Sequence, residues 1–159
     1  MRVTLLCVGK LKERYLADAA AEYAKRLRPH AQVEIVEVAE EKALESLSMA
    51  QAERVKEMEA QRLLQRLKPE ALLVALAIEG ENMGSEAFAR RLSEWALHGK
   101  SAVAFAIGGS LGLHKSLLQR ADLLLSFGAM TYPHQLMRVL LLEQIYRAFK
   151  INRGEPYHK

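Results

Sequence analysis

The stretch FAIGGSLG, residues 105–112, ends an apolar run on two adjacent glycines and adds a third glycine three residues later. A strand, a glycine turn and a helix in succession are typical of nucleotide-binding loops. The dinucleotide motif is excluded because its glycines are spaced differently and follow the first strand of a unit, whereas this turn follows the fourth predicted strand. The phosphate-loop motif is excluded because Leu113 and His114 separate the last glycine from Lys115.

The chain on both sides of this turn alternates between the periods of strands and helices. Residues 79–85 are predicted to form a loop, and Ser85 and Thr131 are predicted to cap the helices that follow them. We expect an α/β fold, a single domain over residues 1–159 with a parallel-rich sheet flanked by helices. The predicted strands are 2–9, 32–38, 71–78, 101–107 and 122–127, and the predicted helices are 13–28, 45–67, 85–98, 114–121 and 134–151.

The composition is that of a folded chain, with 50% apolar and 26% charged residues over a length of 159. The N-terminal apolar stretch is predicted to be a buried strand rather than a signal peptide, and no run is long enough for a membrane span. Cys7 is the only cysteine and the histidines are scattered, so we expect no metal site and a cytoplasmic location. The net charge of +4 permits an RNA partner without requiring one.

A second glycine loop, FGAMTYPH at residues 127–134, also follows a predicted strand and precedes a helix. In open α/β sheets, ligands bind at the carboxyl ends of the strands, where Gly108 and Gly109 also lie. Glycines let the backbone approach a ligand closely. The two loops are therefore predicted to form two walls of one pocket. Their backbone groups and apolar side chains suit an adenine-containing ligand better than a bare polyphosphate.

The last predicted helix carries apolar side chains in almost every direction, which predicts burial by more than one surface and favours a dimer interface. Glu143 and Arg147 have a favourable i,i+4 spacing. Arg138 lies in the first turn beside His134, on a mainly apolar face. It is either part of a structural ion pair or an anion contact near the pocket mouth.

The tail after this helix contains cations, an aromatic ring and an imidazole, in the order Arg153, Tyr157, His158 and Lys159. Tails are usually frayed, but this composition suits contacts with the backbone and bases of RNA.

Several segments together closely resemble the RlmH family of SPOUT-class methyltransferases. They are IGGSLGLHK at 107–115, LSFGAMTYPHQLMRVLLLEQIYRAFKI at 125–151 and RGEPYHK at 153–159, with LLCVGK at 5–10 and AIEGE at 77–81 in agreement. The resemblance covers essentially the whole chain, is strongest over the last third, and is least diagnostic between about 40 and 70.

The resemblance implies an S-adenosyl-L-methionine-dependent enzyme that methylates N3 of a pseudouridine in bacterial 23S ribosomal RNA, on the assembled 70S ribosome. It also implies a homodimer and a C-terminal trefoil knot, which ordinary topology rules would disfavour. Neither a metal nor a membrane is expected. The cofactor residues implied are Leu76, Gly108, Gly109, Phe127, Gly128, Ala129, Met130, Thr131 and Tyr132.

By residue type, the predicted catalytic residues are His134, Arg138, Tyr157 and His158, and the predicted RNA contacts are Arg147, Arg153 and Lys159. His134 and His158 are candidates for the general base, and Tyr157 for stacking on the target base. Two other functions are considered. A non-enzymatic ribosome-binding or assembly factor would not need intact glycine loops, and a small-molecule nucleotide enzyme would need phosphate-binding groups.

Overall fold

The computed structural model describes residues 1–42 and 45–159, in which one five-stranded sheet runs in the order β2-β1-β4-β3-β5. Every neighbouring pair of strands is parallel, which confirms the predicted α/β fold. The strands are β1 (Arg2–Val8), β2 (Gln32–Val38), β3 (Leu72–Asn82), β4 (Ala102–Ile107) and β5 (Leu123–Ser126). The helices are α1 (Arg14–Leu27), α2 (Met49–Arg66), α3 (Ser85–Leu97), α4 (Lys115–Arg120) and α5 (His134–Asn152).

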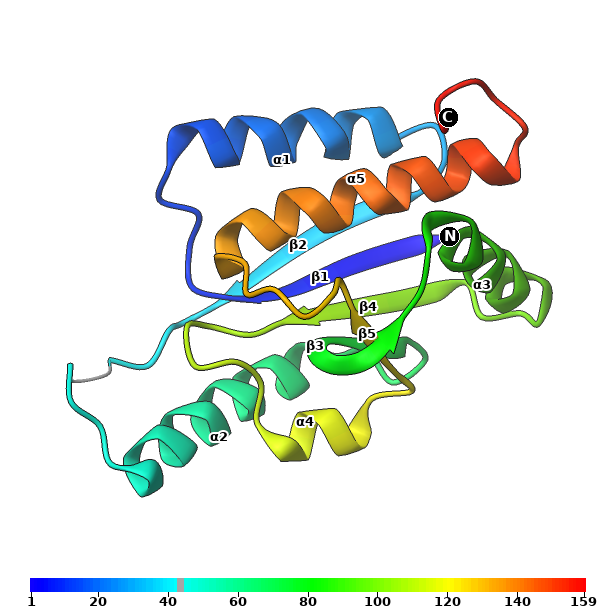
Figure 1. The fold of residues 1–159 in the computed structure, drawn as a ribbon. Helices are drawn as coiled ribbons and strands as arrows, with labels where there is room; N and C mark the ends of the chain where they lie inside the picture. Colours follow the sequence, from blue (N-terminus) through cyan, green and yellow to red (C-terminus); the bar gives the residue numbers. More distant parts are fainter. Residues whose placement is uncertain (43–44) are drawn as a thin grey trace.

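Helices cover both faces of the sheet. In Figure 1, α1 and α5 lie over one face and α2 and α4 over the other, with α3 beside α5. Phe105 packs in the core beneath α1, α3 and α5, and Leu6 in the core beneath α2 and α4. All six residues of β4 are buried because the strand has a neighbour on each side and a helix layer on each face. β2 lies at a sheet edge, and its alternation of buried and more exposed residues fits that position.

Helix α2 begins at Met49 rather than at residue 45. Ser48 Oγ accepts a hydrogen bond from the backbone N–H of Gln51 (3.2 Å), and the Gln51 side chain accepts one from the backbone N–H of Ser48 (2.9 Å). This reciprocal pair is a capping box, which satisfies two backbone donors that the helix leaves free. The cap therefore sets the start of the helix.

Strand β3 continues to Asn82, although residues 79–85 were predicted to form a loop. Leu125 in β5 pairs with both Leu76 and Glu81 of β3, with an irregularity between those two positions. The far end of β3 curves across β5 in Figure 1. A Cβ on Gly80 would lie 2.7 Å from the backbone of Leu124, so the crossing requires glycine. The end of β3 has a polar sequence that does not indicate a strand, and it forms one because its backbone pairs with β5.

Both predicted caps are wrong. Helix α3 is preceded by Gly84, and the hydroxyl of Ser85 instead donates to the side-chain oxygen of Gln144 in α5 (2.6 Å). Helix α5 begins after Pro133, and Thr131 lies exposed in the loop before it. In the part of the chain that the structure describes, no helix is long and apolar enough to cross a membrane.

Candidate functional site

The two glycine loops line one cavity of about 800 Å³ at the carboxyl ends of β4 and β5. Residues 76–79, at the irregular part of β3, form a third wall, and Lys56 of α2 stands at its edge. The predicted meeting of the two loops is therefore confirmed. All the residues predicted to hold a cofactor line this cavity except Ala129, which lies exposed outside it. Their role in binding remains a prediction.

The first glycine turn folds back on itself closely. The backbone N–H of Gly112 donates to the carbonyl of Gly109 (3.0 Å), and Gly112 has a φ of +84°. A Cβ on Gly108 would lie 2.7 Å from the backbone carbon of Gly112. Any side chain at position 108 would push the two arms of the turn apart, so the cavity wall here is backbone.

The second loop is anchored by a buried hydroxyl. Ser126, 3% exposed, accepts a hydrogen bond from the backbone N–H of Gly128 (3.1 Å). Gly128 has a φ of +112°, which favours glycine. This turn redirects the chain from β5 towards α5. It leaves Phe127 half-buried and Tyr132 38% exposed at the rim.

His134 is the titratable imidazole of the cavity wall. Burial lowers its pKa below the ordinary value of 6.5, and the charge of Arg138 adds to this effect, while Glu40 opposes it. The ring is therefore neutral near pH 7 and has a nitrogen free to accept a proton.

Arg138 lies outside the cavity lining and is fully buried. Its Nη1 donates to Glu37 (2.7 Å), and its Nη2 donates to the carbonyls of Val8 (3.0 Å) and Gly9 (2.8 Å). Of the two interpretations of this arginine, the geometry shows the structural ion pair, and the anion contact stays a prediction. Since His134 is one helical turn earlier, the pair fixes the start of α5 and with it the imidazole.

Comparisons with known proteins agree over the full length. A family model described as "Predicted SPOUT methyltransferase" matches residues 1–158. The chain belongs to the SPOUT methyltransferase family. Proteins named "Ribosomal RNA large subunit methyltransferase H" from Carboxydothermus hydrogenoformans and from Bifidobacterium animalis subsp. lactis are each 56% identical to it over 159 residues. The match covers all of this chain and all of each relative.

A solved structure described as a probable methylase family protein from Haemophilus influenzae Rd KW20 shares the fold. It has a TM-score of 0.54 and 11% identity, covering 99% of this chain and 70% of that one. Membership of the SPOUT methyltransferase family makes the chain an enzyme and favours this function over a non-enzymatic assembly factor.

The tail of this SPOUT methyltransferase packs on α5, outside the cavity lining. Tyr157 Oη donates to Glu143 Oε1 (3.0 Å), and the guanidinium of Arg147 lies 4.7 Å from the centre of the Tyr157 ring. Arg147 also pairs with Glu143 (2.5 Å), which confirms the predicted i,i+4 contact. Burial and the hydrogen bond to Glu143 raise the pKa of Tyr157 to about 12, so its hydroxyl stays protonated.

The remaining tail residues are more exposed. A ring nitrogen of His158 lies 3.2 Å from Arg147, and its other nitrogen lies 3.8 Å from Glu86. Arg153 lies 3.8 Å from Glu155, and Lys159 is exposed. The structure therefore separates Tyr157, His158, Arg147, Arg153 and Lys159 from the cavity of their own chain.

A smaller cavity of about 290 Å³ joins these two regions. Its lining includes Leu125, Phe127 and Tyr132, which the large cavity shares, and Glu143, which anchors Tyr157. The tail thus borders the site through Glu143. In residues 1–42 and 45–159, no group of three or more His, Cys, Asp or Glu side chains is placed to hold a metal ion.

The sequence reasoning missed Lys56 and residues 77–79 in the cavity wall of this SPOUT methyltransferase. Residues 77–79 continue a predicted strand into a segment interpreted as a loop. Lys56 lies on a helix rich in charged residues, and such charges are typical of a solvated helix face. The residues next to such a lysine in the sequence do not indicate that it lies beside the cavity in the folded chain.

Proposed function

We propose that the chain transfers a methyl group from S-adenosyl-L-methionine to N3 of a pseudouridine in 23S ribosomal RNA of the 70S ribosome. When bound, the cofactor supplies an electrophilic methyl group: its C–S bond breaks as the C–N bond forms, leaving S-adenosylhomocysteine. The N3 proton leaves to a base. The observation that carries this proposal is the cavity between the two glycine loops.

The residues of the cavity fit this cofactor. A volume of about 800 Å³ is within the usual range for ligand sites. The backbone wall at Gly108–Gly112 offers amide and carbonyl groups to an adenine edge, and Leu76, Phe127 and Tyr132 offer apolar surface to its faces. These groups bind and orient the donor, which is the main contribution a protein makes to cofactor chemistry.

The proposed substrate rests on the two relatives whose names specify large-subunit ribosomal RNA. The described residues form one sheet, and the net charge of the sequence is only +4. We therefore infer that shape complementarity with an assembled ribosome contributes more than a broad basic patch. We propose a cytoplasmic location, because the proposed substrate is the ribosome.

His134 is the proposed acceptor of the N3 proton, because it is the neutral imidazole in the cavity wall. Arg138 is a positioning residue that holds the start of α5 through Glu37, Val8 and Gly9. The tail residues Tyr157 and His158, with Arg147, Arg153 and Lys159, are the proposed contacts with RNA.

We also propose a homodimer in which the tail acts at the cavity of the second copy. The tail packs outside its own cavity lining. Large apolar side chains are exposed around the cavity mouth: Ile78 (54%), Leu111 (38%), Met130 (75%) and Tyr132 (38%). A second copy would cover them. The trefoil knot stays part of this proposal and rests on membership of the SPOUT methyltransferase family.

The reaction is tested by incubating the protein with S-adenosylmethionine labelled in the methyl group and with 70S ribosomes, free large subunits or protein-free ribosomal RNA. We expect label at N3 of a pseudouridine of 23S RNA, and the most label with 70S particles. Equal methylation of protein-free RNA would refute the assembled substrate. Ribosome binding without label in any sample would favour the assembly factor.

The placement of the tail is tested with mixed dimers. A Gly108→Val protomer lacks a usable cavity but has a tail, and a protomer without residues 157–159 has the cavity alone. If tails act across the dimer, co-expression restores one active site per mixed dimer, although each parent is inactive. Inactive mixed dimers would mean that the tail acts at the cavity of its own chain.

A further inference from the structure

Lys56 of helix α2 lines the cavity, although nothing in the sequence of this helix indicates a function. Among the described residues that line the cavity, only Lys56 and Glu79 have side chains with a formal charge at neutral pH. The Lys56 side chain is 21% exposed, with its Nζ 2.5 Å from Glu53 Oε1. Helix α2 therefore brings one cation to a cavity wall that is otherwise mainly backbone and apolar groups.

Glu59 fixes this part of α2 against the first glycine turn. Its side chain is buried, and Oε2 accepts a hydrogen bond from the backbone N–H of Glu41 (3.0 Å). Its Oε1 lies 3.2 Å from the place that a Cβ on Gly109 would take. Helix α2 thus packs closely against the glycine turn. Lys56, three residues before Glu59 on the same helix, lies beside the cavity.

Glu53, the present partner of Lys56, has a second contact. Its Oε2 lies 3.6 Å from Nε2 of the buried His114. The backbone N–H of Ser116 donates to Nδ1 of that ring (3.2 Å), so the histidine proton is assigned to Nε2, facing Glu53. Glu53 thus keeps a partner when Nζ turns away from it. The exchange costs little, because Glu53 is half-exposed and ion pairs with a solvent-exposed partner contribute little to stability.

We propose that Lys56 binds the carboxylate of the methionyl end of S-adenosylmethionine and so sets which end of the molecule lies beside α2. The assignment rests on the proposed function. A carboxylate that leaves water needs charged or N–H donors, and a charge-assisted hydrogen bond is the stronger of these. Among the described lining residues, Lys56 is the one that supplies a positive charge. Lys56 is thus a specificity-determining residue for donors that carry an amino-acid group.

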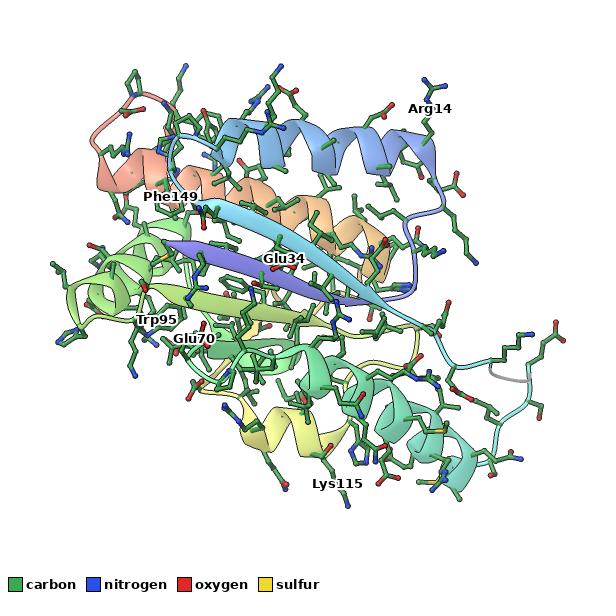
Figure 2. The ribbon with its side chains drawn as sticks, turned by 180° about the vertical axis from the view of Figure 1, so that it is seen from behind. Arg14, Glu34, Glu70, Trp95, Lys115 and Phe149 are labelled. Carbon is green, nitrogen blue, oxygen red and sulfur yellow. The ribbon has the colours of Figure 1, made fainter. Side chains whose placement is uncertain are left out.

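The test is calorimetric binding of S-adenosylmethionine, S-adenosylhomocysteine and 5′-methylthioadenosine, which lacks the amino-acid end. Lys56→Met should weaken binding of the first two by roughly 10- to 100-fold, the range for a hydrogen bond to a charged group, and leave the third unchanged. Lys115→Met is the matched control, because this lysine points away from the molecule (Figure 2) and the same charge is removed. We expect it to bind all three like the wild type.

Two results would overturn the assignment. An equal loss for all three compounds would mean that Lys56 only shapes the cavity. Wild-type affinity for all three with slower methylation of ribosomes would mean that Lys56 contacts an RNA phosphate instead. Failure of the wild-type protein to bind S-adenosylmethionine is a different outcome, because it would refute the proposed function before any variant is compared.

Discussion

Arg138 in α5 and Glu37 in β2 form an ion pair of 2.7 Å across 101 residues of sequence. The same guanidinium also donates to the carbonyls of Val8 and Gly9, where β1 ends. One side chain therefore ties the start of the last helix to the ends of the first two strands. Its burial is complete, whereas the side chain of Glu37 is 34% exposed.

Replacing Arg138 with methionine should lower the free energy of unfolding by about 3 kcal/mol, because Glu37 and two backbone carbonyls lose their donor. Urea denaturation measures the change. Arg14→Met is the control: Arg14 projects from the start of α1 (Figure 2) and pairs with Asp18 at 3.8 Å with 95% of its side chain exposed. That variant should stay within about 0.5 kcal/mol of the wild type. Equal free energies of unfolding for the two variants would show that the Arg138–Glu37 pair does not stabilise the fold.

Replacing Gly80 with alanine should destabilise the crossing of β3 and β5. The new Cβ would meet the backbone of Leu124 at 2.7 Å, and overpacking of this kind costs roughly 1–3 kcal/mol. Gly84→Ala has no atom within 4 Å of the new Cβ and should change stability by less than about 1 kcal/mol. Thermal unfolding compares the two. A Gly80 variant as stable as the Gly84 variant would contradict the close approach.

Tyr157 should lose its proton at a higher pH than an ordinary tyrosine, since burial and the hydrogen bond to Glu143 raise its pKa to about 12. Ultraviolet titration of the folded protein should show a late phenolate phase that Tyr157→Phe removes. Tyr15→Phe, at a residue that is 69% exposed, should leave that phase in place. A late phase that survives Tyr157→Phe would mean that the tail does not pack on α5 in solution.

His134 should titrate below 6.5 in the folded chain, because burial opposes its charge. The unfolded chain takes up a proton there while the folded chain does not, so the free energy of unfolding falls as the pH drops below 6.5. His134→Gln should reduce this fall. His30, whose pKa burial also lowers, contributes a separate part, so His30→Gln is measured beside it. An NMR midpoint of His134 at or above 6.5 would contradict this assignment.

The sheet and the two glycine loops could be predicted because their signals are local. Strand β4 is apolar at every position, as a central parallel strand must be, and glycines mark the turn that follows it. The same reasoning predicted two walls of one cavity, and the loops at 108–112 and 127–134 do line it.

Features held by distant partners could not be predicted. The end of β3 is polar and is a strand only because β5 pairs with it. Arg138 left two interpretations open until its partner Glu37 was seen in space. Lys56 looks like any surface lysine of a charged helix, and only the position of α2 beside the glycine turn brings it to the cavity. Contacts between residues that are far apart in the sequence leave no periodic pattern of apolar and polar residues from which they could be predicted.

The pairing of Leu125 with both Leu76 and Glu81 also determines when the cavity exists. Its walls come from three separate segments, and they meet only after β5 has joined β3. A partly folded chain therefore has no binding site, and a ligand of the cavity binds the native state alone. By mass action, such a ligand at 100 times its dissociation constant adds about 2.7 kcal/mol to the stability of the entire fold. A thermal-shift screen would thus detect ligands of this cavity without any RNA.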